Sequence, residues 1–196
     1  SIFNILKKKH HISPGIVQMN YMYRLLLSEQ KIQRNLQFET FTKGKTVRVN
    51  SGVIVITVLT SPYPNGQTFS CPHDCYYCPN EPGQPRSYLK NEPAVMRANQ
   101  NDFDAASQFW NRASTLSLNG HKIDKVELLV LGGTWSSYPL EYQEEFCRDL
   151  YYAANTFYQN KDTRRRRYSL ETEIQMNEMT KVRVIGLTLE TRPDYV

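Results

Sequence analysis

Three short apolar runs, separated by longer amphipathic segments, constrain the fold of this 196-residue chain more than any other feature. Each run is a nearly continuous series of branched apolar side chains, which is typical of strands buried on both faces of a parallel sheet. The runs span residues 52–60, 125–131 and 182–189, and helices are predicted between them at about 94–118, 140–158 and 169–179. Strands that alternate with helices predict an α/β fold with right-handed crossovers, resembling part of a (β/α) barrel.

An unusual motif follows each predicted strand at its carboxyl end. The first strand is followed by three cysteines, Cys71, Cys75 and Cys78. The second is followed by a glycine pair and a threonine, Gly132, Gly133 and Thr134. The third is followed by a charged turn, Glu-Thr-Arg-Pro-Asp, which begins at Glu190. Because (β/α) barrels place their active sites at this edge of the sheet, we expect the three motifs to form one site. Two adjacent glycines also let the backbone approach a ligand closely, although a plain tight turn would need them as well.

The spacing of the three cysteines indicates a metal centre. Soft sulfur ligands favour zinc or an iron-sulfur cluster, and three thiolates on a 4Fe-4S cluster leave one iron open for a cofactor. A structural zinc site normally has four protein ligands, so zinc would need His73 as the fourth. Cys75 and Cys78 could instead be a dithiol pair, which would leave Cys71 without a role. The fourth cysteine, Cys147, falls on a predicted helix and is expected to be a buried thiol.

The charge of the chain permits an acidic partner. The net charge is +5 and the isoelectric point is near 9.0, which suits nucleic acid but also many ordinary enzymes. Two basic clusters, Lys7 to Lys9 and Arg164 to Arg167, are candidates for phosphate contacts, and the simpler interpretation of each is a solvated helix end or loop. We expect residues 1–50 to form a basic segment with one or two helices and residues 51–196 to form the main domain. The ordinary cysteine content and the absence of an apolar run of about twenty residues predict a cytoplasmic protein with no membrane span.

Several stretches resemble one enzyme family. The cysteine spacing, with Tyr77 before the last cysteine, is similar to that of radical S-adenosylmethionine (SAM) enzymes. More specifically, the chain resembles the catalytic subunit of Elongator, in the radical SAM tRNA uridine acetyltransferase family, over residues 53–62, 71–88, 92–104, 120–134 and 186–195. Many relatives have more residues between the first two cysteines, so the shorter loop indicates a divergent branch.

The resemblance implies a set of cofactors and site residues. Cys71, Cys75 and Cys78 would hold a 4Fe-4S cluster, Lys125 would contact acetyl-CoA, and SAM would be held by Tyr77, by Gly132, Gly133 and Thr134, and by Glu190. SAM cleavage would give a radical that abstracts hydrogen from acetyl-CoA, whose acetyl carbon then adds to the wobble uridine of tRNA. The implied partners are tRNA and other Elongator-type subunits or a second copy of the chain. A radical SAM enzyme with another substrate, and a zinc-stabilised RNA-binding module without catalysis, are the alternatives.

Three strands cannot close a barrel. The third strand would leave an unpaired edge, so we expect a partial (β/α) barrel of the radical SAM type that is truncated after about three strands. The acetyltransferase domain that the family carries would then lie outside this sequence.

Overall fold

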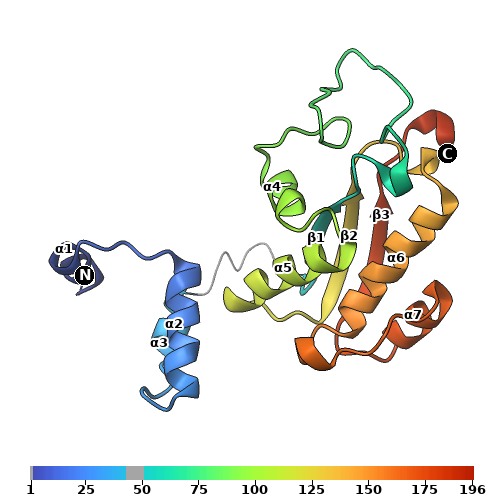
Figure 1. Cartoon of the computed structure of the whole chain (residues 1–196). Helices are drawn as coiled ribbons and strands as arrows, with labels where there is room; N and C mark the ends of the chain where they lie inside the picture. The colour runs from blue at the N-terminus through green and yellow to red at the C-terminus, as the bar shows by residue number, and fades with distance from the viewer. Residues whose placement is uncertain (1, 43–50) are drawn as a thin grey trace. The chain divides into compact units, whose positions relative to one another are not determined.

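The computed structural model describes residues 2–42 and 51–196 (Figure 1). It divides into two compact units. The first contains the N-terminal helices together with residues 114–122, and the second contains residues 51–113 and 123–196. None of the helices in the described ranges is both long and apolar enough to cross a bilayer.

The N-terminal unit has three helices in its described part, where the sequence predicted one or two. They are α1 (Ile2–His10), α2 (Ile16–Ser28) and α3 (Leu36–Thr42). The additional helix arises because Gln30 takes a left-handed backbone conformation after α2, and because the Asn35 side chain accepts a hydrogen bond from the Phe38 N–H at the start of α3. The lysines of the basic cluster lie in the last turn of α1, where the negative end of the helix dipole favours cations.

The second unit is built on a parallel sheet of three strands in the order β1, β2, β3. The strands are β1 (Ile54–Leu59), β2 (Lys125–Leu131) and β3 (Arg183–Leu189). Both strand pairs are parallel, with Ile56 opposite Leu128 in the first and Leu128 opposite Leu187 in the second. The predicted three-strand parallel sheet is therefore confirmed. Its carboxyl ends lie together at one edge, where the long loop after β1 and the last residues of the chain also run (Figure 1).

Four helices accompany the sheet, where the sequence predicted three. They are α4 (Pro93–Gln100), α5 (Ala105–Leu118), α6 (Leu140–Asn155) and α7 (Leu170–Asn177). Short 3-10 turns occupy Pro64–Gly66, Trp135–Ser137, Lys161–Thr163 and Pro193–Tyr195.

The single helix predicted at 94–118 is wrong, because the chain breaks between α4 and α5. Asp102 and Phe103 both have positive φ, and the Phe103 N–H donates to the Ala98 carbonyl, which ends α4. Asp104 then begins α5, since its carboxylate accepts a hydrogen bond from the Ser107 N–H at 2.7 Å.

The core of the second unit lies between the sheet and the helices. Side chains that point inward from β1, β2, α5 and α6 are fully or almost fully buried, among them Ile56, Leu128, Val130, Phe109 and Leu150. Each aliphatic side chain of this size stabilises the fold by about 1.5–3 kcal/mol when it leaves water. This core fixes the strand ends, and through them the loops that follow.

The outer edge of β1 is closed by side chains. Gln108 on α5 is fully buried, and its amide both accepts from the Leu59 N–H at 2.9 Å and donates to the Leu59 carbonyl at 2.8 Å. Arg97 on α4 donates to the Thr57 carbonyl at 2.6 Å. These bonds satisfy backbone groups that a neighbouring strand would otherwise take, so β1 is built as an end strand.

Three of the four arginines at 164–167 pack against the helices, which corrects the prediction of a solvated loop. Arg164 stacks on the Trp110 ring at 3.7 Å, Arg167 pairs with Asp149 at 3.0 Å, and Arg165 binds the fully buried carboxylate of Glu173 with two contacts of 2.6 Å. The run therefore helps to hold α6 and α7 together. Only Arg166 has no such ion pair or ring contact within the described residues.

A candidate cofactor site at the carboxyl end of the sheet

The cysteines lie on a loop between β1 and α4, and Ser70 anchors its start. The Ser70 side chain accepts a hydrogen bond from the Arg86 N–H at 2.7 Å, which ties the start of the loop to its return. The Ser70 carbonyl accepts from the Thr134 N–H at 3.0 Å, which ties the loop to the segment after β2. We call residues 70–78 the cysteine loop. Its position is thus set by contacts rather than by regular secondary structure.

Each sulfur of the three cysteines receives a hydrogen bond from a different residue. The Thr134 hydroxyl donates to Cys71 at 3.1 Å, and the Ser87 hydroxyl donates to Cys78 at 3.3 Å. The Arg192 guanidinium donates to Cys75 at 3.0 Å. Because Thr134 follows β2 and Arg192 follows β3, the cysteine loop is connected through its sulfur atoms to the exits of both other strands.

The described residues contain no group of three His, Cys, Asp or Glu side chains placed to hold one metal ion. The described residues therefore form no closed zinc site. His73, the proposed fourth zinc ligand, has its Nε2 3.1 Å from the Tyr195 hydroxyl and its ring edge-on to that tyrosine. What fits an iron-sulfur cluster is the chemistry of the donors, since three thiols on one loop each have a hydrogen-bond donor at the sulfur.

The glycine pair after β2 lies where the three strand exits pack most tightly. Gly132 and Gly133 have φ of 135° and 113°. A β-carbon on Gly132 would meet the Thr60 hydroxyl oxygen, and one on Gly133 would meet the Ser70 carbonyl, both well under 3.0 Å. Contacts inside the protein are thus sufficient to require glycine at both positions.

The peptide groups of Gly132 are occupied by protein partners. Its carbonyl accepts from the hydroxyls of Tyr138 and Thr60, the latter at 3.2 Å. Its N–H donates to the Glu190 carboxylate at 3.0 Å. Gly133 forms no backbone hydrogen bond of this kind within the described residues.

Glu190 joins three segments of the site. The oxygen that accepts from Gly132 also accepts from the Tyr88 hydroxyl at 2.8 Å, and the Glu190 carbonyl accepts from the Trp135 N–H at 3.0 Å. Burial, together with the hydrogen bond to Glu190, raises the pKa of Tyr88, so this phenol stays protonated and donates. The second oxygen of the Glu190 carboxylate forms no hydrogen bond with the described residues.

The other predicted site residues lie apart from this arrangement. Tyr77 is on the cysteine loop but its side chain is 86% exposed. Lys125 is exposed at the amino end of β2, roughly 20 Å from the carboxyl end at 3.3 Å per residue. Cys147 is on α6, and burial raises its pKa to about 11.

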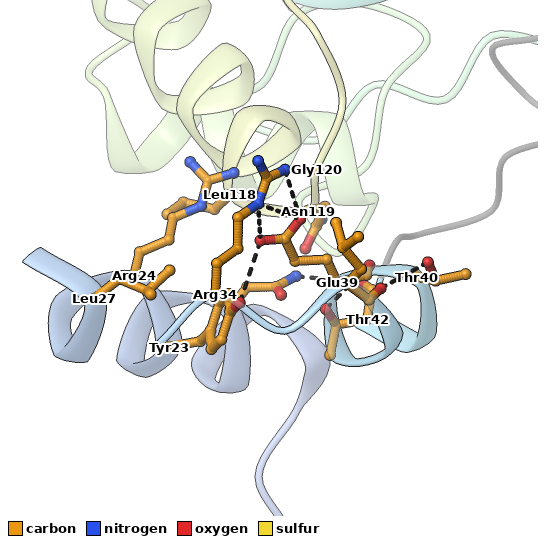
Figure 2. Close-up of a pocket in the computed structure, with 12 residues that line it drawn as sticks. Tyr23, Arg24, Leu27, Arg34, Glu39, Thr40, Thr42, Leu118, Asn119 and Gly120 are labelled. Carbon is orange, nitrogen blue, oxygen red and sulfur yellow. Dashed lines mark hydrogen bonds and ion pairs between the residues drawn. The ribbon is translucent and has the colours of Figure 1, made fainter. Parts of the chain in front are cut away.

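The N-terminal unit has a separate pocket of about 560 Å³, lined by α2, α3 and residues 118–120 (Figure 2). Arg34 and Glu39 face each other in it with contacts of 2.9 and 3.0 Å, and the Tyr23 hydroxyl donates to the same carboxylate. The hydrogen bond from Arg34 lowers the pKa of Glu39. These charged groups satisfy one another, whereas the side-chain oxygen of Asn119, which also lines the pocket, is buried without a hydrogen-bond partner among the described residues.

Comparison with known proteins gives a consistent set of relatives. No protein-family profile matches the chain. A tRNA uridine(34) acetyltransferase from Dehalococcoides mccartyi is 38% identical over 150 residues, which is 76% of this chain and 30% of the relative. Elongator complex protein 3 from Danio rerio is 35% identical over 164 residues, which is 78% of this chain and 27% of the relative. Over the part that it spans, the chain is similar to tRNA uridine(34) acetyltransferase and to Elongator complex protein 3.

A solved structure supports the same relationship. The archaeal Methanocaldococcus infernus Elp3 with an N-terminal deletion matches with a TM-score of 0.50 and 29% identity, over 74% of this chain and 24% of that one. The chain therefore spans about a third or less of the length of these relatives. The parallel α/β sheet is the part of the fold that the structural match supports.

Five residues of the site had no role in the sequence interpretation. They are hydroxyl, phenol and guanidinium groups that orient the cysteine loop and the glycine pair, namely Thr60, Ser70, Ser87, Tyr88 and Arg192. Arg192 could have been found, because it lies in the Glu-Thr-Arg-Pro-Asp turn that resembles the Elongator family. The other four are serine, threonine and tyrosine residues in stretches where no sequence motif indicates a functional role.

Proposed function

We propose that this chain supplies the cluster-binding and SAM-binding part of an enzyme that modifies the wobble uridine of tRNA. The names of its relatives, tRNA uridine(34) acetyltransferase and Elongator complex protein 3, support this substrate and a complex of several subunits. On this proposal the sheet is the first part of a (β/α) barrel of the radical SAM type, and residues 1–50 form a separate basic segment. The protein works in a reducing compartment such as the cytoplasm, where the cysteines remain thiols.

One observation carries the proposal. The sulfurs of Cys71, Cys75 and Cys78 each accept a hydrogen bond, and the donors to two of them come from the exits of β2 and β3. Hydrogen bonds to ligand sulfurs are a principal means by which proteins orient and tune iron-sulfur clusters. When bound, a 4Fe-4S cluster supplies the electron that cleaves SAM. The remaining residues position the cofactors and exclude water.

The SAM site we propose uses groups that have no hydrogen-bond partner among residues 2–42 and 51–196. These are the Gly133 peptide and the second oxygen of Glu190. The resemblance adds Tyr77, which is exposed on the cysteine loop. Gly132 and Thr134 hold this segment in shape, because their backbone groups are bonded to Glu190, Tyr138 and Ser70. A charged ligand would thus find one peptide and one carboxylate oxygen on a rigid frame.

Lys125 is proposed to contact acetyl-CoA on the resemblance alone. Its place at the amino end of β2 puts it outside the cluster site, so its contact would be with a part of the cosubstrate far from the reacting atoms. We propose tRNA binding through basic side chains, of which the lysines of α1 are the first candidates.

Anaerobic reconstitution with iron and sulfide tests the proposal. We expect about four irons per chain and the brown colour of a 4Fe-4S cluster. Cys75→Ala should lose the iron, whereas the matched Cys147→Ala variant should keep it, because Cys147 is on α6 away from the loop. Stoichiometric zinc without iron uptake would instead favour the zinc-stabilised RNA-binding module.

A further inference from the structure

Arg192 is the one residue after β3 that reaches a cysteine sulfur in the described part of the chain. Its guanidinium has three nitrogens, and Asp194 occupies two of them, with contacts of 2.9 Å to Nε and 3.0 Å to Nη2. The third nitrogen, Nη1, donates to the Cys75 sulfur at 3.0 Å. The two contacts with Asp194 therefore fix the orientation of the planar Arg192 guanidinium, so that Nη1 points at the Cys75 sulfur.

The donor to Cys75 differs in charge from the donors to the other two sulfurs. Cys71 and Cys78 receive hydrogen bonds from the neutral hydroxyls of Thr134 and Ser87. Cys75 receives one from a cation, because a guanidinium stays protonated in proteins. The Arg192 side chain is 31% exposed, so water only partly screens this charge.

We infer that Arg192 is a positioning residue that donates a charged hydrogen bond to the Cys75 ligand and raises the reduction potential of the cluster, while Asp194 limits that rise. The inference rests on the proposed function, since it requires a cluster on the three cysteines. Reduction adds one negative charge next to the guanidinium, so a cation at the sulfur stabilises the reduced form more than the oxidised form. The carboxylate of Asp194 acts in the opposite direction.

The two side chains therefore predict potential shifts of opposite sign. Arg192→Gln removes the cation and keeps an amide donor, and we expect the equilibrium constant for reduction to fall at least about tenfold, which is 59 mV for a one-electron couple. Asp194→Asn keeps Arg192 and removes the anion, and the potential should rise. Ser87→Ala removes a neutral donor from Cys78 and is the matched control, with a smaller fall. The measurement is a redox titration of the reconstituted chain followed by electron paramagnetic resonance, with circular dichroism to verify folding.

The outcomes separate this inference from the proposed function. Failure of the unsubstituted chain to take up iron is a failure of the proposed function. If the chain takes up iron but Arg192→Gln shifts the potential no more than Ser87→Ala, the charge has no such role and the inference is overturned. If Arg192→Gln does not assemble a cluster, Asp194→Asn decides: a raised potential supports the role of the cation, and an unchanged or lowered one overturns it.

Discussion

Gly132 and Thr60 approach so closely that no β-carbon fits between them. The residue after β1 and the residue after β2 lie side by side because their strands are paired in register up to Leu59 and Leu131. The Thr60 hydroxyl also donates to the Gly132 carbonyl, so the same side chain that excludes a β-carbon holds the peptide in place. The glycine and the threonine form one structural unit.

Gly132→Ala should therefore destabilise the fold by several kcal/mol, since overpacking costs about 1–3 kcal/mol and an unfavourable φ costs about 1–3 kcal/mol more. Adding Thr60→Ala removes the nearest atom and should recover part of that loss. Gly133→Ala should not be rescued by Ser70→Ala, because the β-carbon there meets a backbone carbonyl. Urea unfolding of the four variants measures these differences. Equal rescue at both positions would contradict this explanation.

A second prediction concerns Gln108, whose buried amide covers the outer edge of β1. Gln108→Leu has a similar size but leaves the N–H and the carbonyl of Leu59 buried without partners, at a cost of about 1–3 kcal/mol for each group. Gln175→Leu, at an exposed position on α7, is the control and should change stability by less than about 0.5 kcal/mol. Denaturant melts compare the two. If both variants unfold at the same midpoint, the edge is satisfied in another way.

The pair of Arg165 and Glu173 predicts a loss of stability in acid. Burial by itself raises the pKa of Glu173, but hydrogen bonds from Arg165, Tyr168 and Asn155 outweigh it, and the pKa is lowered overall. A carboxyl whose folded pKa is lowered stabilises the fold above its unfolded pKa of about 4.3, and loses that contribution as pH falls through the folded value. Removing one member of a buried pair costs about 3 kcal/mol, so Glu173→Gln should be less stable at pH 7 and should depend less on pH below about 5.

Thermal melts between pH 7 and pH 3 test this dependence. Glu171→Gln is the matched control, because Glu171 is two residues away on the same helix and is exposed. The control should behave like the unsubstituted chain. A Glu173→Gln variant with an unchanged acid profile would show that the pair does not contribute.

The fourth cysteine offers a prediction about reactivity. Burial raises the pKa of Cys147 to about 11, and only the thiolate reacts with alkylating agents. In a variant with Cys71, Cys75 and Cys78 replaced by serine, the alkylation rate should still rise about tenfold per pH unit from pH 8 to pH 10. An ordinary thiol, with a pKa of about 8.5, would level off in this range. A plateau near pH 9 would mean that the α6 thiol is not shielded.

The sequence predicted the sheet well because each strand is identified by its own residues. The alternation of Val126, Leu128 and Val130 on the buried face needs no information from elsewhere in the chain. The apolar spacing over residues 94–118 hardly changes and therefore predicts one continuous helix. The helix breaks at Asp102 and Phe103, which have positive φ, and the sequence has no glycine there to indicate a break. Local sequence patterns predict helices and strands, but they do not predict helix breaks at residues other than glycine.

The site was predictable in its motifs and not in its contacts. Cys75 and Arg192 are 117 residues apart in the chain, and their hydrogen bond exists only because parallel pairing brings the strand ends together. For the arginine run at 164–167, the sequence pattern itself led to a wrong prediction. Charge density alone predicted a solvated loop, whereas Trp110, Asp149 and Glu173 supply partners from α5, α6 and α7 that no local pattern identifies.

The last prediction concerns tRNA binding, for which the structure changes the design of the experiment. Replacing all four arginines would remove the ion-pair partner of the buried Glu173, so any loss of binding would be confounded with unfolding. Arg166→Ala is the clean variant of that cluster, because the side chain is exposed and the contacts with α5, α6 and α7 belong to its neighbours. The comparison is a variant with Lys7, Lys8 and Lys9 replaced by alanine.

Each phosphate contact contributes about 0.7 to 0.9 to the slope of log affinity against log salt. If the three lysines of α1 bind phosphates, the triple variant should lose up to about 2 to 3 in slope, whereas Arg166→Ala should lose at most about one contact. Folded tRNA should also bind more tightly than an unstructured strand of equal length, since shape and phosphate geometry carry recognition of structured RNA. Affinities measured over a salt series test both expectations. If the parent slope persists in both variants, these charges do not contact tRNA, and the proposal that they do is wrong.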